Sequence, residues 1–379
     1  MCGPPPPPSC AICNKNQGLL LCTACKIVHY CCRGHQIEHR PAHKEACDAI
    51  KRANKNVEIQ ESRLRLTEID CATALSLSTY KFGKNLENAR AALFEALTAV
   101  ETKASLEAQF EDMHRLFLLG PHTVPFARYY VQSLMLRLGK DQECYDLIVW
   151  FRSVIDTHPL DWASESQYGV TVKGADPLEA YRIAIGGQTE LDLKINRALI
   201  KARLCIDWDT IKDMAAKGAT KVSGESSTKI QPHVFESSIV ANNPKIFDDK
   251  GEFFGGIMRV QTYMMLAFVT AENKHYWPAL FSPDALTNHS KRFKVESFID
   301  KSWSSHSPEP AKALVDLTID AWLSTPKAFD FMREEYERMM RLEKEENIPL
   351  PHDPFSGRTA DQLPLGLDAV TASQNCPIM

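Results

Sequence analysis

The sequence predicts a mainly α-helical protein with a small cysteine-rich segment at its amino terminus. Three observations lead to this prediction. Apolar residues recur every three or four positions in several stretches, strand patterns are sparse, and eight of the 12 cysteines lie within the first 47 residues. A chain of 379 residues is long enough to bury a substantial core in one large or two medium domains.

The overall composition is that of an ordinary globular protein. Hydrophobic residues make up 44% and charged residues 24%, and the net charge of -4 gives no general attraction to nucleic acid. No run of about 18 apolar residues and no secretory signal is found, so we expect an intracellular protein. In a reducing compartment, crowded cysteines favour metal ligation over disulfides. The scattered Cys71, Cys144 and Cys205 are expected to be buried apolar thiols.

Composition along the chain predicts four parts. They are a proline-rich leader at 1–9, the cysteine-rich segment at 10–47, a helical domain at 48–346 with a loop-rich segment at about 212–256, and a flexible tail at 347–379. The leader carries five consecutive prolines, which hold an extended left-handed helix. The tail contains several prolines and few large apolar residues, which is typical of a segment without its own core.

Two apolar stripes in the helical domain are typical of helices that bury one face. Each has apolar residues in steps of three or four. Ser307 and Pro308 predict the start of the second helix and Pro326 its break. The stripes are Leu191, Ile195, Leu199, Ala202 and Ile206 in the first helix, and Leu314, Leu317, Ala321 and Leu323 in the second.

Residues 127–151 are predicted to form two helices joined as an αα-hairpin. Gly139 would end the first helix, and Asp141 would cap the second. Such a hairpin is the building unit of helical repeat folds, although no convincing 34-residue period is found, so a repeat array is left open. The apolar faces are Tyr130, Val131, Leu134 and Leu138 in the first helix, and Cys144, Tyr145, Ile148 and Phe151 in the second.

Four close pairs of cysteine and histidine within residues 10–47 predict bound metal. Zinc prefers four nitrogen or sulfur donors in a tetrahedron, and close pairs supply them with little loop entropy. Two pairs have the spacing of a tight turn, and two have the i, i+4 spacing that places both donors on one face of a helix. The pairs are Cys10 and Cys13, Cys22 and Cys25, Cys31 and His35, and His43 and Cys47.

This spacing, with Tyr30 before the fifth donor and Lys44 after the seventh, resembles the MYND finger. The resemblance implies that the pairs interleave, with each zinc ion held by three cysteines and one histidine. Because protein atoms would fill every position, both ions would be structural, and their binding would supply folding free energy that so short a segment lacks. The implied sites are Cys10, Cys13, Cys31 and His35 for the first zinc, and Cys22, Cys25, His43 and Cys47 for the second.

The segment departs from the family pattern at two positions. His35 stands where the family usually has cysteine, and zinc accepts imidazole equally well. Arg40 stands where many members have the tryptophan that, with a glutamine here matched by Gln36, forms a shallow groove for short proline-containing peptides. That partner class is implied by the resemblance, but the aromatic wall of the groove is missing. Cys32 and His39 are neighbouring donors that leave an exchange of ligands open.

The sequence beyond the finger suggests a function in protein contact. The segment from His39 to Lys44, together with residues 136–146, resembles fungal MYND-finger proteins with helical bodies, a group that implies no activity. We therefore expect a non-enzymatic adaptor or scaffold that binds protein partners. Its oligomeric state is not indicated.

The carboxyl end predicts a lipid modification. Cys376, Pro377, Ile378 and Met379 fit a prenylation signal whose last residue favours farnesyl. One farnesyl chain gives only marginal membrane binding, and no polybasic cluster precedes Cys376, so membrane attachment would be weak and would depend on that modification.

Two other functions are weighed against the adaptor. A transcriptional or chromatin-associated regulator could use basic residues of the finger region, but nearby acidic residues do not favour direct contact with nucleic acid. A SET-type lysine methyltransferase is a remote alternative, since Asn288-His289-Ser290 matches only part of a SET motif and no catalytic residues can be chosen. The basic residues are Lys26, Arg33, Arg40, Lys44, Lys51 and Arg52.

Overall fold

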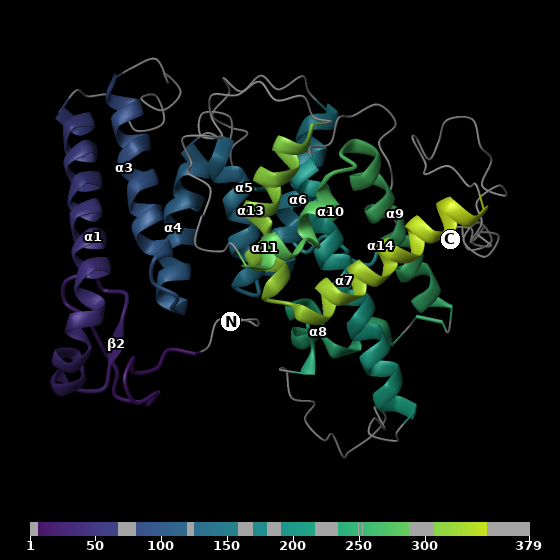
Figure 1. Ribbon diagram of the computed structural model, residues 1–379, viewed down its shortest axis with the longest axis horizontal. Coiled ribbons are helices and arrows are strands. Elements are labelled where there is room, and N and C mark those ends of the chain that lie inside the picture. Colours follow the sequence, from purple (N-terminus) through teal and green to yellow (C-terminus); the bar gives the residue numbers. More distant parts are fainter. Residues whose placement is uncertain are drawn as a thin grey trace. The chain divides into compact units, whose positions relative to one another are not determined.

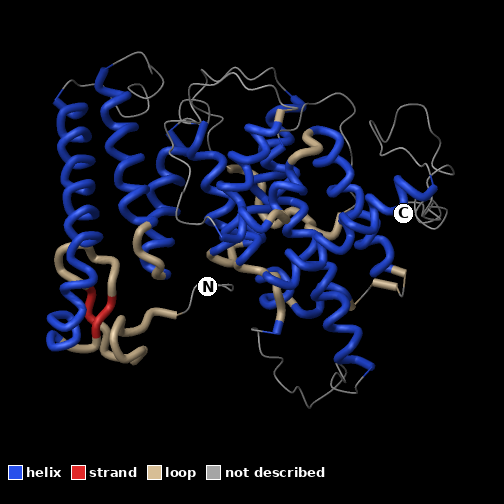
Figure 2. Tube along the Cα trace, viewed as in Figure 1, coloured by secondary structure: helices blue, strands red, loops and turns tan. Residues whose placement is uncertain are grey.

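The computed structural model describes most of the chain and has the mainly α-helical fold that the sequence predicts. The described residues are 7–66, 81–119, 125–157, 170–179, 191–216, 234–248, 250–251, 253–287 and 307–346. They contain twelve α-helices and one two-stranded sheet (Figures 1 and 2). None of the described helices combines the length and the apolar character needed to cross a membrane. Cys2, Cys71, Cys376 and the predicted tail lie outside these residues.

The chain divides into two compact units, with the main change at Lys140 and Asp141. The first unit holds the cysteine-rich segment and four helices, each of which packs against the next along the chain (Figure 1). Its elements are β1 (Leu20–Leu21), β2 (His29–Tyr30), α1 (Arg33–Leu66), α3 (Lys81–Thr98), α4 (Lys103–Leu119) and α5 (Pro125–Arg137).

Helix α1 leads from the cysteine-rich segment into the helical body. It is 34 residues long, so the predicted domain boundary between residues 47 and 48 falls inside it. Pro41 lies within the helix, where its ring removes one backbone donor without ending the helix. Cys47 and Ile50 occupy successive turns on the buried face. The last zinc-ligand candidate and the first body residue therefore belong to one rigid element.

Helices α1 and α3 form one hydrophobic core with the cysteine-rich segment. On α1, Ile50, Val57 and Leu64 recur every seven residues and are at most 7% exposed, which places them along one packing seam. They meet the buried face of α3, where Leu86 is fully buried. Burying each such side chain contributes about 1.5–3 kcal/mol. The same core contains Cys22, Cys25, Ile27, Val28, Tyr30 and Cys47 from the amino-terminal segment.

Polar contacts also join the helices of the first unit. The buried guanidinium of Arg90 on α3 contacts Asp112 on α4 and donates to Glu61 on α1 at 2.5 Å. Thr102, before α4, accepts the backbone N–H of Ser105 at 3.1 Å as a helix cap and also donates to the carbonyl of Ile27 at 3.3 Å. The turn between α3 and α4 is thus fastened directly to the cysteine-rich segment.

The second unit is built around α7 (Leu191–Ala216), which packs along α9 (Phe254–Glu272). Helix α13 (Pro308–Leu323) also contacts α7 and α10 (Tyr276–Leu280), and α14 (Pro326–Glu346) contacts α7, α9 and α13. The remaining elements of this unit are α6 (Asp141–Thr157), α8 (Ser238–Asn242), the 3-10 helix η3 (Pro244–Phe247) and α11 (Pro283–Thr287).

The helix predicted from the apolar stripe of residues 191–206 is present, and Leu191, Ile195, Leu199 and Ala202 are buried, but burial is not confined to that face. Helix α7 is buried nearly all round from Leu191 to Trp208, and Ile206 of the predicted stripe is only half-buried. Charged residues that suggest a solvated face are instead buried and bound. Lys201 donates to the carbonyls of Pro177 and Glu179 and to the side chain of Gln261 at 2.7–3.0 Å. Since these partners come from distant segments, the local pattern could not reveal the burial.

Two further charges of α7 are satisfied in the same way. Arg203 forms an ion pair with the fully buried Asp141 and donates to Thr325 at 2.6 Å. Asp207 accepts the backbone N–H groups of Glu236 and Ser237 at 2.7 and 2.8 Å. Burial of Asp207 raises its carboxyl pKa to about 7, even though the two N–H groups lower it.

The other helix predictions have mixed outcomes. Helix α13 begins at Pro308 after Ser307 and ends at Leu323, as predicted, while Pro326 starts α14. Helices occupy both halves of residues 127–151, but α5 and α6 belong to different units, so their hairpin stays a prediction. Asp141, the residue expected to cap the second helix, directs its carboxylate to Arg203 and accepts the backbone N–H of Ser238.

The segment expected to be loop-rich contains helical turns. It includes the end of α7, then α8 and η3, and the first turn of α9, where the helix tolerates two glycines.

Cys144 and Cys205 are buried thiols, as predicted, and burial raises the pKa of each.

Candidate metal centres

Two tight turns present the first four cysteines in the same way. The N–H of Asn14 bonds to the carbonyl of Cys10 at 3.0 Å, and the N–H of Lys26 bonds to that of Cys22 at 2.8 Å. Asn14 and Lys26 have φ values of 58° and 60°, in the left-handed region that ordinary side chains rarely adopt. Each residue directly follows the second cysteine of its pair. The repeated turn fixes both thiols of a pair on the same side.

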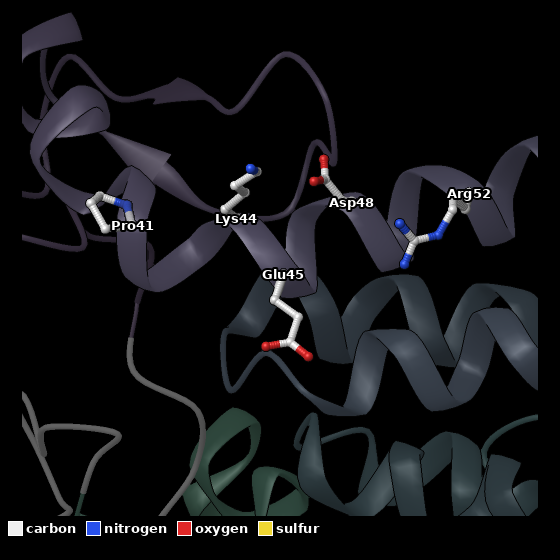
Figure 3. Close-up of a pocket in the computed structure, with 5 residues that line it drawn as sticks. All are labelled: Pro41, Lys44, Glu45, Asp48 and Arg52. Atoms are coloured by element: carbon white, nitrogen blue, oxygen red, sulfur yellow. The ribbon is translucent and has the colours of Figure 1, made fainter.

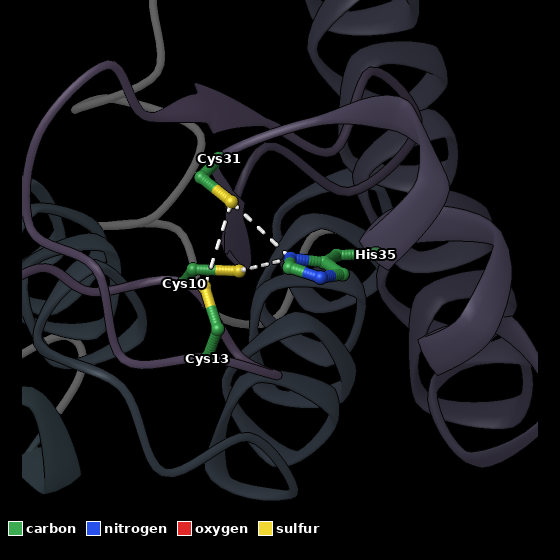
Figure 4. A group of neighbouring side chains, drawn as sticks. All are labelled: Cys10, Cys13, Cys31 and His35. Carbon is green, nitrogen blue, oxygen red and sulfur yellow. Dashed lines mark hydrogen bonds between the residues drawn. The ribbon is translucent and has the colours of Figure 1, made fainter.

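The first cluster contains Cys10, Cys13, Cys31 and His35, and Figure 4 shows the four side chains pointing towards one another. His35 Nδ1 lies 3.4 Å from Cys10 Sγ and 3.2 Å from Cys31 Sγ. The sulfur atoms of Cys13 and Cys31 are 3.5 Å apart. Cys10 is buried and Cys13 is exposed, so the cluster lies at the protein surface, with Cys10 on its inner side.

The second cluster contains Cys22, Cys25, His43 and Cys47, and all four are buried. His43 Nε2 lies 3.3 Å from Cys25 Sγ, and the sulfur atoms of Cys22 and Cys47 are 3.7 Å apart. His43 and Cys47 lie one turn apart on α1, as their i, i+4 spacing predicts. This cluster therefore forms the end of the core shared with α3.

Both donor sets fit zinc. With Zn–S bonds of about 2.3 Å and Zn–N bonds of about 2.05 Å, tetrahedral ligands lie about 3.8 Å apart for two sulfurs and about 3.6 Å apart for sulfur and nitrogen. The observed sulfur–sulfur separations of 3.5 and 3.7 Å are close to the first value. The sulfur–nitrogen separations of 3.2–3.4 Å are close to the second. Two structural zinc ions are consistent with these clusters, each held by three thiolates and one imidazole.

The electrostatics of the clustered thiols favour a bound cation. Burial alone would raise the pKa of Cys10, but backbone N–H groups of Cys13, Ile12 and Cys31 lower it to about 5. The pKa of Cys31 rises to about 12, chiefly through its contact with the thiol of Cys13. Burial raises the pKa of Cys47 to about 12. The three thiols of a cluster lie too close together to ionise at the same time, and a divalent cation removes that repulsion.

Neighbouring side chains hold the second cluster in position. Tyr30, only 2% exposed, makes a hydrogen bond of 3.0 Å between its hydroxyl and His39 Nδ1. The His39 ring stacks on that of His43, with 5.6 Å between centroids and 7° between planes. Gln36 donates to Cys22 Sγ at 3.8 Å. The sequence offers His39 as an alternative ligand, and its i, i+4 spacing from His43 places both rings on the same face of α1.

The predicted donors are the ones that lie together, and one local expectation is wrong. Neither His39 nor the exposed Cys32 belongs to either cluster. Cys31 and His35 were expected on one helical face, but α1 begins at Arg33, so Cys31 lies before the helix. The backbone still brings both donors together because the chain turns into α1 between them.

Comparison with known proteins agrees with this geometry. A scan against protein-family models matches residues 10–47 to the MYND finger. These residues form a MYND finger that carries both Cys/His clusters. Searches of curated proteins and of solved structures found no match.

Proposed function

We propose that this protein is a non-enzymatic adaptor or scaffold in which the zinc-stabilised finger binds partner proteins. MYND fingers generally mediate contacts between proteins. The observation that carries the proposal is the composition of the two clusters, each of which offers four protein donors. A zinc ion held by four protein ligands has no vacant position for water or substrate, so its role is to fix the shape of the finger.

The finger also has a surface suited to contact with a protein. Leu20 and Leu21 of β1 are 65% and 45% exposed, and Ile37 in the first turns of α1 is 61% exposed. Gln36 bonds to Cys22, directly after β1, so these apolar side chains belong to neighbouring parts of the finger. Exposed apolar side chains on a rigid frame are typical of interaction sites.

The partner class follows from the family resemblance and from this surface. Short proline-containing peptides are the ligands that the resemblance implies, and Gln36 lies at the finger surface beside the exposed Arg40. We propose that Arg40, in place of an aromatic side chain, changes the preferred sequence of the peptide. An intracellular location and a relationship to fungal MYND-finger proteins with helical bodies belong to the same proposal.

A transcriptional or chromatin-associated regulator is the second candidate. It is favoured by the basic residues of α1, which are described below. In this function the finger would contact other regulatory proteins, and direct binding to nucleic acid would be secondary.

Affinity capture with the full-length protein tests the adaptor function. The wild type is compared with Cys22→Ser, which removes a buried donor of the second cluster, and with Cys32→Ser, which changes an exposed thiol outside both clusters. We expect bound proteins that are retained by Cys32→Ser and lost by Cys22→Ser. Zinc analysis of the same preparations should give two ions per chain for the wild type and Cys32→Ser.

Two results would overturn the proposal. Capture of the same proteins by Cys22→Ser would show that the finger is not the binding element. Turnover of a substrate by the purified zinc-loaded protein would contradict the non-enzymatic function.

A further inference from the structure

Helix α1 has an exposed face that is strongly basic. At 100° per residue, its cations fall within an arc of about 120° that begins beside the buried Cys47 and extends away from the buried His43 and Ile50. The steps between most of them are three, four or seven residues, so they form a line about 33 Å long. All six are exposed. This basic stripe consists of Arg33, Arg40, Lys44, Lys51, Arg52 and Lys55.

The cations of the basic stripe have no carboxylate partners in the described part of the chain. Helix α14 shows the contrasting arrangement of a solvated charged helix. There Arg333 pairs with Asp330 at 2.8 Å, and Arg338 pairs with Glu335 at 2.5 Å, both with i, i+3 spacing. Unpaired like charges along one face repel one another. An anionic partner would remove that repulsion.

Apolar side chains lie on the same face as the basic stripe. Ile37 and Ile59 follow its helical phase and are 61% and 40% exposed. Leu66, at the end of α1, is 85% exposed and continues the line. The face therefore offers both cationic and apolar contacts, a combination typical of protein-binding surfaces.

A shallow depression marks the middle of this face. It is lined by Pro41, Lys44, Glu45, Asp48 and Arg52, all from α1 (Figure 3). Figure 3 shows Lys44 and Asp48 on one side of the helix and Glu45 pointing away from them. Asp48 thus lies between cations of the stripe, Glu45 lies at its edge, and the exposed Glu58 follows Lys55 by about one turn within the same arc.

We propose that the basic stripe docks an acidic segment of a partner protein that also carries apolar side chains. The proposal rests on the adaptor function and names the chemistry of one partner. A protein segment can place carboxylates opposite the cations, a different residue opposite Asp48, and apolar groups over Ile37 and Ile59. Nucleic acid and anionic membrane are uniformly negative and offer no group that pairs with Asp48, and a phosphate backbone would leave the isoleucines uncovered.

Direct binding by the zinc-loaded full-length protein tests this proposal. The probe is a labelled synthetic peptide of repeated Glu-Glu-Leu-Glu units, long enough to span the stripe, and fluorescence anisotropy measures its affinity. The test variant reverses Lys51, Arg52 and Lys55 to glutamate, all beyond the last zinc donor. A matched variant makes the same change of charge on α14 at Arg333, Arg338 and Lys344. Duplex DNA and vesicles containing phosphatidylserine are tested in parallel.

We expect the peptide to bind the wild type and the α14 variant with similar affinity. Its affinity for the stripe variant should be lower by a factor of about ten or more, and its affinity for the wild type should fall as the salt concentration rises. Equal binding by wild type and stripe variant overturns the proposal, as does failure of the wild type to bind the peptide. Binding of DNA or vesicles in preference to the peptide assigns the stripe to that other class. If the peptide fails while Cys22-dependent capture persists, the docking proposal is wrong and the adaptor function stands.

Discussion

A core substitution outside both metal clusters should weaken zinc binding. Leu86 on α3 is fully buried and packs in the core that also contains Cys22 and Cys47. Leu86→Ala removes buried methyl groups and should cost about 2–5 kcal/mol. The binding free energy of structural zinc in small fingers is about 10–16 kcal/mol, which is comparable with the whole unfolding free energy of a domain. If the finger and the α1–α3 pair fold together when zinc binds, this loss appears in the apparent zinc affinity, as a decrease of about 30-fold or more.

Competition with a chelating dye measures the zinc affinity of the purified protein. The matched control is Leu199→Ala on α7, which truncates a similarly buried leucine side chain in the second unit. That variant should lose stability and keep the wild-type zinc affinity. If Leu86→Ala binds zinc as tightly as the wild type, the finger folds independently of α3, and the shared core has no thermodynamic consequence.

Two predictions concern the buried charges of α7. Arg203→Met leaves the carboxylate of Asp141 buried without its cation and should lower the unfolding free energy of the second unit by about 3–5 kcal/mol. Denaturant unfolding measures this loss. Adding Asp141→Asn to the same chain should restore part of it. Asp207 has a folded pKa of about 7, against an ordinary carboxyl pKa of 3.8. Between these pH values unfolding releases its proton, so stability should fall as pH rises from about 4 to about 7. The same melts with Asp207→Asn should show a smaller fall over that range, and an identical fall would exclude Asp207 as its source.

The zinc clusters could be predicted from the sequence because each pair of donors is close along the chain. Cys10 with Cys13 and His43 with Cys47 each depend on one turn or one helical step, which spacing alone reveals. The start of α1 was harder to predict, because Cys31 and His35 have helical spacing although the helix begins between them. The pairing of clusters across the finger came from family resemblance, since spacing alone allows several combinations.

The environment of α7 could not be predicted from local pattern. Lys201, Arg203 and Asp207 indicate a polar face when only the neighbouring residues are considered. Their partners lie far away in the chain, with Gln261 and Thr325 about 60 and 122 positions from Lys201 and Arg203. A charge can be buried when distant backbone and side-chain groups satisfy it, and such groups leave no mark on helical periodicity.

The continuity of α1 explains how metal binding can organise a surface outside the finger. Residues on a straight helix keep a fixed angular relation of 100° per position. The second cluster fixes the direction of His43 and Cys47, and the same helix then turns Ile50 and Val57 towards α3. Lys51 and Lys55 lie about 100–160° around the helix from Ile50 and Val57 and are therefore held outward. Removal of zinc would release this constraint, so binding of an acidic peptide to the basic stripe should weaken after chelation even though none of the stripe's cations is a metal ligand.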